Sequence, residues 1–193
     1  MVHLIVLELM SPHKSYATSN HAIRRWHALV LANLALSFYN VAIIWTMQLD
    51  VFYSWRYIPS DLFGQAQGQH FLRLFITVFP QALLTTILAG LLLKLRPKAI
   101  MRWPLRLAFG LQLLLWLLTA ILWGRWQGQI ATLPPGAEAP MLGPANHRLY
   151  QTLLNTHWLR VGMITVYALI AAWLAKRTFL PSARSSDLEE MCA

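Results

Sequence analysis

Four long apolar runs, each interrupted by only a few polar residues, divide this chain. The runs cover residues 28–49, 72–93, 105–124 and 149–175. An α-helix rises about 1.5 Å per residue, so about 20 mostly apolar residues cross the hydrocarbon core of a bilayer. The apolar part of the last run, Leu159 to Ala175, is short and reaches this length only if its helix begins near Leu149. The pattern predicts an all-α fold, an integral membrane four-helix antiparallel bundle.

Composition agrees with lipid as the solvent for much of the surface. Hydrophobic residues make up 57% of the 193 positions and charged residues only 12%, whereas charged residues are about a quarter of an ordinary soluble chain. The mean hydropathy is +0.47. The single cysteine, Cys192, excludes an internal disulfide and a cysteine-ligated cluster.

The formal net charge of +9 comes from basic residues that flank the apolar runs. Their position beside the runs favours anionic lipid headgroups as partners and argues against nucleic acid. Three clusters, at the N-terminal flank, between the second and third runs and at the C-terminal flank, hold most of them: Lys14, Arg24, Arg25; Lys94, Arg96, Lys98, Arg102, Arg106; Lys176, Arg177, Arg184. Because basic residues concentrate on the cytoplasmic side, we predict that both termini face the cytoplasm, N-in/C-in.

Tryptophan positions support the same topology. The nine tryptophans fall mainly near the predicted ends of the runs, with only Trp116 well inside one, and Trp prefers the headgroup level of a bilayer. We therefore divide the chain into a cytoplasmic segment 1–26, a transmembrane domain 27–178 and a cytoplasmic tail 179–193. The expected location is a bacterial inner (cytoplasmic) membrane or a thylakoid-type membrane.

Two longer connections are expected on the outer side. They cover Asp50 to Phe71 and Arg125 to about Asn146, and the second contains the proline- and glycine-rich stretch TLPPGAEAPMLGP. Such a composition is typical of irregular backbone. The tail PSARSSDLEEMCA is expected to be disordered.

Carboxylates are too few for several kinds of catalytic site. There are seven, and most lie near the chain ends; a di-metal centre in a helical bundle needs about four Glu and two His on inward faces. The sequence has no HExxH, GxSxG or glycine-rich phosphate loop. We therefore predict no metal site.

Polar residues gather instead at the outer ends of three runs. Gln48 ends the first, Thr119 lies two-thirds along the third, and Arg160 opens the fourth. Polar side chains inside a membrane tend to face the bundle interior or a cavity, so we predict that these three converge in a pocket that opens outward. The alternative is that Arg160 extends to the headgroups while Gln48 and Thr119 join helices by hydrogen bonds.

Histidines suggest a second kind of site. His70 and His157 open the second and fourth runs from the outer side, at similar depth, and His27 lies at the inner end of the first. Two imidazoles at one depth are candidate ligands of a haem or chlorin. The alternative is that both lie at the interface and bond to water.

The order of several short motifs resembles a group of small four-helix bacterial integral membrane proteins of unknown function, distantly related to the anthrone-oxygenase-like family. The matching motifs are WTMQ at the end of the first run, WLLTA in the third and THWLR at the start of the fourth. Ser54 after Tyr53, His157 before Trp158 and Val161 after Arg160 depart from the pattern of that group. The resemblance, with the polar set above, gives these candidate ligand-binding residues: Trp45, Gln48, Tyr53, Trp116, Thr119, His157, Trp158 and Arg160.

Two functions remain open at this point. The sequence also leaves open whether the protein is an enzyme. The first is a small membrane subunit, or an assembly or accessory protein of a larger membrane complex, that holds a lipid or pigment. The second, which the resemblance implies, is an oxygenase-like membrane enzyme or a binder that acts on a lipophilic aromatic or quinone at the outer pocket. The scarcity of acid and base groups favours the first. The expected partners are membrane lipids and other membrane subunits, and nucleic acid is not expected.

Overall fold

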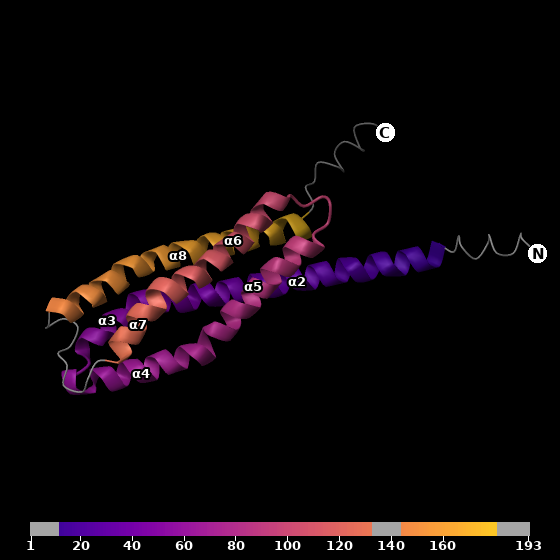
Figure 1. The fold of residues 1–193 in the computed structure, drawn as a ribbon. Coiled ribbons are helices and arrows are strands. Elements are labelled where there is room, and N and C mark those ends of the chain that lie inside the picture. Colours follow the sequence, from indigo (N-terminus) through magenta and orange to yellow (C-terminus); the bar gives the residue numbers. More distant parts are fainter. Residues whose placement is uncertain (1–11, 133–143, 181–193) are drawn as a thin grey trace, which may run out of the picture.

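The computed structural model describes residues 12–132 and 144–180, with side chains described for all of these except 12–20, Ser60 and 144–146. Every regular element in these ranges is helical (Figure 1). In chain order they are α2 (Pro12–Thr46), η1 (Met47–Val51), α3 (Phe52–Ser54), η2 (Trp55–Tyr57), α4 (Ser60–Thr77), α5 (Phe79–Leu95), α6 (Arg102–Leu118), η3 (Thr119–Trp123), α7 (Gly124–Ala131) and α8 (Pro144–Phe179). The expected irregular stretch around residues 133–143 and the tail from 181 lie outside the described residues.

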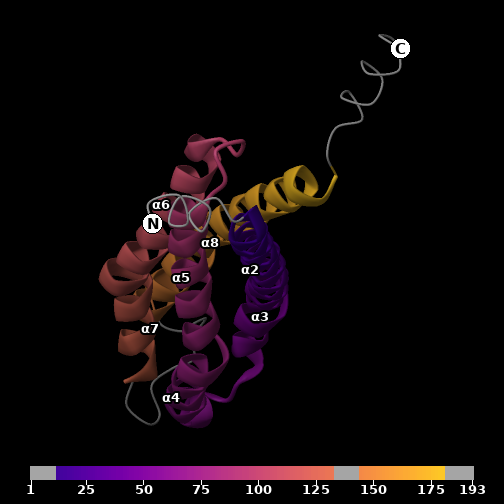
Figure 2. The same cartoon turned by 90° about the vertical axis from the view of Figure 1, so that its right-hand side faces the viewer.

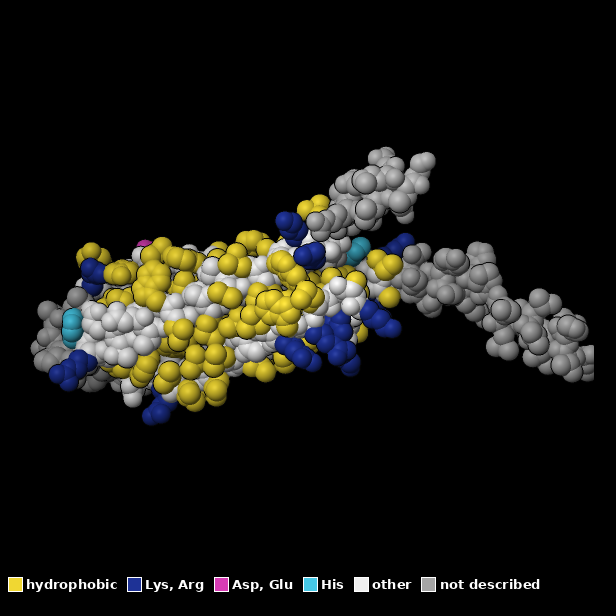
Figure 3. Space-filling model, turned by 90° about the horizontal axis from the view of Figure 1, so that it is seen from above, with side chains coloured by type: hydrophobic (Ala, Val, Ile, Leu, Met, Phe, Trp, Pro, Cys, Tyr) yellow, Lys and Arg dark blue, Asp and Glu magenta, His cyan; other side chains and the backbone are white. Residues whose placement is uncertain are grey.

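Four helical stretches are long and apolar enough to cross a membrane. They are His21–Tyr57, Asp61–Leu95, Arg102–Ala131 and His147–Phe179. Within the described residues, the predictions of an all-helical fold and of four helices long and apolar enough to cross a membrane are confirmed. Yellow hydrophobic side chains cover the middle of the molecule in Figure 3, as the surface of a helix bundle in lipid requires.

The helices extend well past the apolar runs, and the first predicted outer loop is wrong over most of its length. Residues 60–71 belong to α4. Phe63, Gln67 and Leu74 are buried on this helix, at spacings of four and seven that place them on one face. This face packs against α7, so tertiary contacts keep a polar segment helical.

The long helices form a closed ring of contacts. α2 packs against α8 and α5, α5 against α6, and α6 against α8. The α5–α6 connection (residues 96–101) lies at the same end of the molecule as the last turns of α8, while α3, the start of α4, α7 and the start of α8 lie at the other (Figures 1 and 2). We name these the α5–α6 end and the α4–α7 end.

Three local departures from regular α-helix shape the interior near the α4–α7 end. η1 and η3 are π-helical turns, in which the backbone is wider than in an α-helix. Between α4 and α5, Val78 has φ of −117° and the helix direction changes (Figure 1). Pro80 follows two residues later and has no N–H with which to continue the ladder of α4.

Candidate functional site

A cavity of about 90 Å³ lies inside the bundle. Its walls come from all four of the long apolar helical stretches and are mostly aliphatic and aromatic, with Met47, Leu74 and Phe79 among them. The polar side chains in the lining are Asn40, Gln112, Thr119, Gln127, Arg160 and Tyr167. An apolar wall with a few convergent polar groups is the usual composition of a small-molecule site.

Arg160 of α8 supplies the positive charge of the cavity. Its Nη2 donates a hydrogen bond to Thr119 Oγ1 over 3.1 Å, and its Cζ lies 4.2 Å from the centre of the Trp123 ring. A guanidinium over an indole face gains a cation–π attraction that increases when water is excluded. Arg160 Nε is buried and has no hydrogen-bond partner among the described residues.

No carboxylate balances this charge within the described part of the chain. The Asp and Glu residues there are Asp50, on η1, and Asp61, on α4. Both are exposed, and neither lines the cavity. A buried cation without a counter-ion is costly in a medium of low dielectric constant, so an acceptor supplied from outside would stabilise it.

The π-turn η3 brings both partners of Arg160 to it. The N–H of Gly124 bonds to the carbonyl oxygen of Thr119, five residues earlier, which closes the wide turn. A Cβ on Gly124 would lie 2.7 Å from that oxygen, so only glycine fits. Trp123 is fully buried and its Nε1 donates to Thr156 Oγ1 over 3.2 Å, which ties the turn to α8.

Gln48 and His157 form a second buried pair one turn before Arg160. His157 Nδ1 lies 2.8 Å from Gln48 Oε1, and both side chains are 0% exposed. With an oxygen as acceptor, Nδ1 is the nitrogen that donates. The Nε2 atoms of both residues have no partner among the described residues. This pair lies beside the cavity and does not line it.

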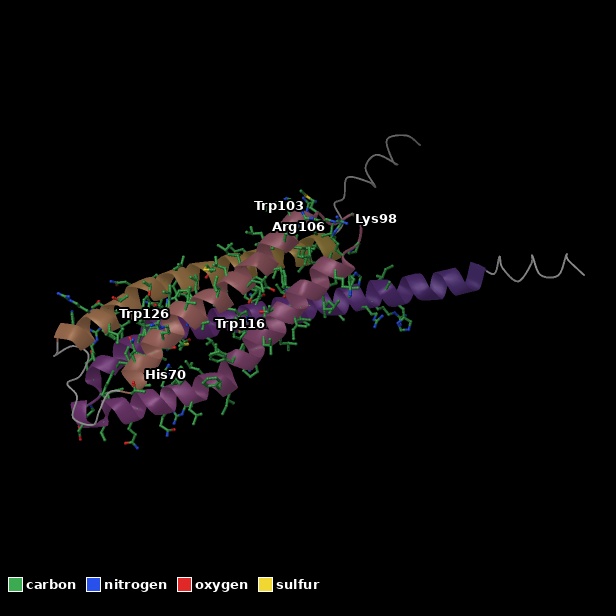
Figure 4. All side chains as sticks on the ribbon, viewed as in Figure 1. His70, Lys98, Trp103, Arg106, Trp116 and Trp126 are labelled. Carbon is green, nitrogen blue, oxygen red and sulfur yellow. The ribbon has the colours of Figure 1, made fainter. Side chains whose placement is uncertain are left out.

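The opposite wall is fixed by hydrogen bonds between α2, α5 and α6. Trp116 Nε1 donates to Thr86 Oγ1 over 2.9 Å, and Asn40 Nδ2 donates to Thr85 Oγ1 over 2.9 Å. Figure 4 shows Trp116, which lines the cavity, in the middle of the molecule. These bonds satisfy polar groups inside the bundle and hold the aromatic wall in one position.

The predicted ligand-binding residues fall into four groups. Trp116, Thr119 and Arg160 line the cavity, and Gln48 and His157 form the adjacent buried pair. Tyr53 packs on the aromatic core at the α4–α7 end. Trp45 and Trp158 are instead 37% and 43% exposed and pack edge to face against each other with ring centres 5.8 Å apart, so they belong to the outer surface of the bundle.

The three candidate haem or chlorin ligands do not face one another across a space. His157 packs against Phe52 at 4.6 Å, Phe52 against Trp55 at 4.9 Å, and Trp55 against His70 at 5.5 Å. Two aromatic rings thus lie between His70 and His157. His27 packs against Phe179 near the α5–α6 end. None of these histidines lines the cavity, and ligation of a haem or chlorin stays an untested prediction.

Five residues that the sequence analysis did not select contribute to the site: Asn40, Gln112, Trp123, Gln127 and Tyr167. Gln127 falls in the second expected outer loop, which was predicted to begin at Arg125, whereas Trp123 was interpreted as an interfacial residue at the outer end of the third run. Gln112 interrupted an apolar run, which is a signal for an inward-facing polar group. Gln127 is buried, lines the cavity, and its Nε2 has no partner among the described residues.

Comparisons with family models, with curated proteins and with solved structures find no match to this chain. The resemblance to the anthrone-oxygenase-like group therefore stays a prediction from the motifs alone. The function has to be argued from the cavity and its chemistry.

Proposed function

We propose that this protein is a membrane-embedded binding protein that holds a lipophilic ring carrying acceptor oxygens, of the quinone class, in the cavity beside Arg160. The observation that carries the proposal is a set of buried N–H donors that have no acceptor among the described residues and that lie in a mostly apolar lining. Arg160 Nε and Gln127 Nε2 are both of this kind. A carbonyl oxygen accepts hydrogen bonds, whereas a pure hydrocarbon leaves such donors unsatisfied.

The chemistry of the lining supports binding over catalysis. Its described polar groups are amides, hydroxyls and one guanidinium, which orient a ligand through hydrogen bonds but are poor general acids or bases near neutral pH. The walls also contain Trp116 and Phe79, whose rings lie 5.8 Å apart. Aromatic faces of this kind pack well on a flat ring.

The size of the cavity limits what enters it. About 90 Å³ is less than an apolar cavity of about 150 Å³ that accepts benzene in another protein. A substituted ring therefore enters with one carbonyl edge first and leaves its remaining substituents toward the lipid. This arrangement suits a molecule with a polar ring and an apolar tail.

We further propose an antiparallel bundle in the N-in/C-in orientation, in a bacterial inner or thylakoid-type membrane. Basic side chains gather at the α5–α6 end, where α8 also ends (Figures 1 and 3), and the positive-inside tendency assigns such an end to the cytoplasm. The cavity then lies toward the outer side, near Gln127 of α7 and the start of α8.

We also propose that the protein has an accessory role in a larger membrane complex, as a subunit or an assembly factor. A protein that binds a lipophilic cofactor without transforming it serves a partner that does. The expectation is that the protein co-purifies from mild detergent with other membrane subunits and that this association withstands washing.

The binding proposal is tested with duroquinone and durene, two flat rings with the same four methyl groups that differ in the two carbonyl oxygens. Equilibrium dialysis against the detergent-purified Cys192→Ser protein measures both affinities; the exchange removes the one thiol. A hydrogen bond to a charged donor contributes about 1.5–3 kcal/mol, so we expect duroquinone to bind at least about tenfold more tightly.

Arg160→Met is the matched variant, because it keeps an unbranched apolar stem and removes the donors. We expect it to lose most of the preference for duroquinone and to keep only the part that Gln127 Nε2 contributes. Durene binding as tight as duroquinone binding in the unsubstituted site would overturn the proposal, as would an unchanged preference in a folded Arg160→Met protein. Circular dichroism and gel filtration check that each protein is folded.

A further inference from the structure

A second hollow lies at the opposite end of the bundle, around the α5–α6 connection. Its volume is about 350 Å³, and it is lined by Leu93, Lys94, Arg96, Lys98, Arg102 and Arg106. Five of these six side chains carry a positive charge. Figure 4 shows Lys98 and Arg106 together with Trp103 at this end of α6.

Arg96 fixes the shape of the hollow. Its Nη1 donates to the carbonyl oxygens of Ile100 at 2.6 Å and Pro97 at 3.2 Å, and the N–H of Ile100 bonds to the carbonyl oxygen of Pro97 at 3.0 Å. The guanidinium thus holds the connection in one closed turn. The remaining cations, Lys98 in that turn and Lys94, Arg102 and Arg106 on either side of it, line the same space.

The positive charge there has no counterpart in the described part of the chain. Arg102 and Arg106 are four residues apart, on one face of α6, where like charges repel. The first turn of α6 carries no acidic residue, and the described carboxylates, Asp50 and Asp61, belong to η1 and α4 at the α4–α7 end. A bound anion would relieve this repulsion.

Exposed apolar side chains border the charged hollow. Leu95, Met101 and Trp103 lie on the same two helices and their connection, and Trp103 is 60% exposed. In Figure 3 the dark-blue basic side chains at this end adjoin the yellow apolar surface of the bundle. Charge beside apolar surface matches a molecule with an anionic head and hydrocarbon tails, and Trp typically lies at the level of lipid headgroups.

We propose that this hollow is a binding site for the phosphate headgroup of one anionic phospholipid, with its acyl chains along α5 and α6. The arginines face the phosphate oxygens, for which the planar guanidinium provides paired donors. Because the site is at the opposite end from the cavity, it does not depend on the proposed binding of a quinone-type ring.

The test measures binding of dioctanoyl phosphatidylglycerol and dioctanoyl phosphatidylcholine to the purified, delipidated protein by titration calorimetry. Each basic residue near a lipid surface contributes about fivefold in affinity. Arg102→Gln together with Arg106→Gln should therefore weaken phosphatidylglycerol binding about 25-fold. Arg24→Gln together with Arg25→Gln removes the same net charge from exposed positions of α2 and should leave the affinity unchanged.

Three outcomes would overturn the assignment. Equal affinity for phosphatidylcholine would show that the negative charge is not recognised. An equal loss in both double variants would show a diffuse charge effect in place of a site. Full competition by sodium phosphate at the affinity of the lipid would identify a site for a free anion. If the double variant at α6 fails to fold, Lys98→Gln, on the exposed connection, should by itself lose about fivefold in affinity.

Discussion

Arg160 Nη2 donates to Thr119 Oγ1 over 3.1 Å, across the contact between α8 and the π-turn η3. The hydroxyl of Thr119 is itself turned toward the carbonyl oxygen of Leu115, 2.6 Å away, so its oxygen is free to accept from the arginine. The bond places the guanidinium on the wall of the cavity. Arg160 therefore faces the interior of the bundle. This position suits a group that binds a ligand, whereas an interfacial anchor would extend to the surface.

Lysine should not replace Arg160. A primary ammonium lacks the planar set of donors that reaches Thr119 and covers the Trp123 ring at the same time. We expect Arg160→Lys and Thr119→Val each to lower the free energy of unfolding in detergent by about 1–3 kcal/mol. The double variant should lose less than the two losses together, because both substitutions remove the same bond. Strict additivity, measured by chemical unfolding, would show that the two residues act independently.

Gln48→Leu should destabilise the protein through His157. It removes the acceptor of a fully buried imidazole, and an unsatisfied buried polar group costs about 1–3 kcal/mol. Gln48→Leu combined with His157→Phe leaves no unpaired donor, so the double variant should be more stable than Gln48→Leu alone. Thermal unfolding followed by circular dichroism compares the two. A double variant less stable than either single variant would contradict the proposed pairing.

Gly124→Ala should disrupt the site although Gly124 does not itself line the cavity. The new methyl group would meet the carbonyl oxygen of Thr119 at 2.7 Å, so η3 has to rearrange and carry Thr119 and Trp123 away from Arg160. We expect lower thermal stability and weaker duroquinone binding.

Gly128→Ala is the control for that substitution, on the same helix. Apart from the backbone of that helix, no atom lies within 4 Å of the position that a methyl group would take there, and alanine favours a helix over glycine by about 1 kcal/mol. This variant should be as stable as the unsubstituted protein or slightly more stable. Equal behaviour of the two alanine variants would mean that η3 tolerates a side chain at Gly124.

Pro80→Ala should reduce ligand binding more than stability. The change of direction at Val78 places Leu74, Val78 and Phe79 on the cavity wall, and alanine lets α4 and α5 join in one straighter helix. Pro80 itself is exposed, so few packing contacts are lost. Equilibrium dialysis with duroquinone and a melting curve separate the two effects. Unchanged binding would show that the bend serves packing alone.

Cysteine labelling tests the N-in/C-in orientation. In the Cys192→Ser background, Tyr57→Cys at the α4–α7 end should react with an impermeant maleimide added to intact cells. Ala99→Cys, in the α5–α6 connection, should react only after the cells are opened. Both positions are exposed, so accessibility differs only through the membrane. Labelling of Ala99→Cys in intact cells would reverse the orientation.

The sequence by itself determined the four long apolar helices, because about 20 consecutive apolar residues have few alternatives to a helix in lipid. It also indicated that Thr119 and Arg160 face the interior, since a polar residue within an apolar run is costly at a lipid-facing position. The sequence also explains why α5 ends just before Pro97, because a residue that precedes proline disfavours helical backbone angles.

Tertiary structure decided which polar groups meet. Gln48 pairs with His157, 109 residues away, and a spacing along one helix says nothing about its partner on another. The π-turns η1 and η3 rotate Gln48 and Thr119 relative to their positions in a regular helix. The hydrophobic periodicity of the sequence does not predict these turns. The helical state of residues 60–71 likewise depends on the contact of α4 with α7, because a polar segment of this kind remains helical through the partner that covers its buried face.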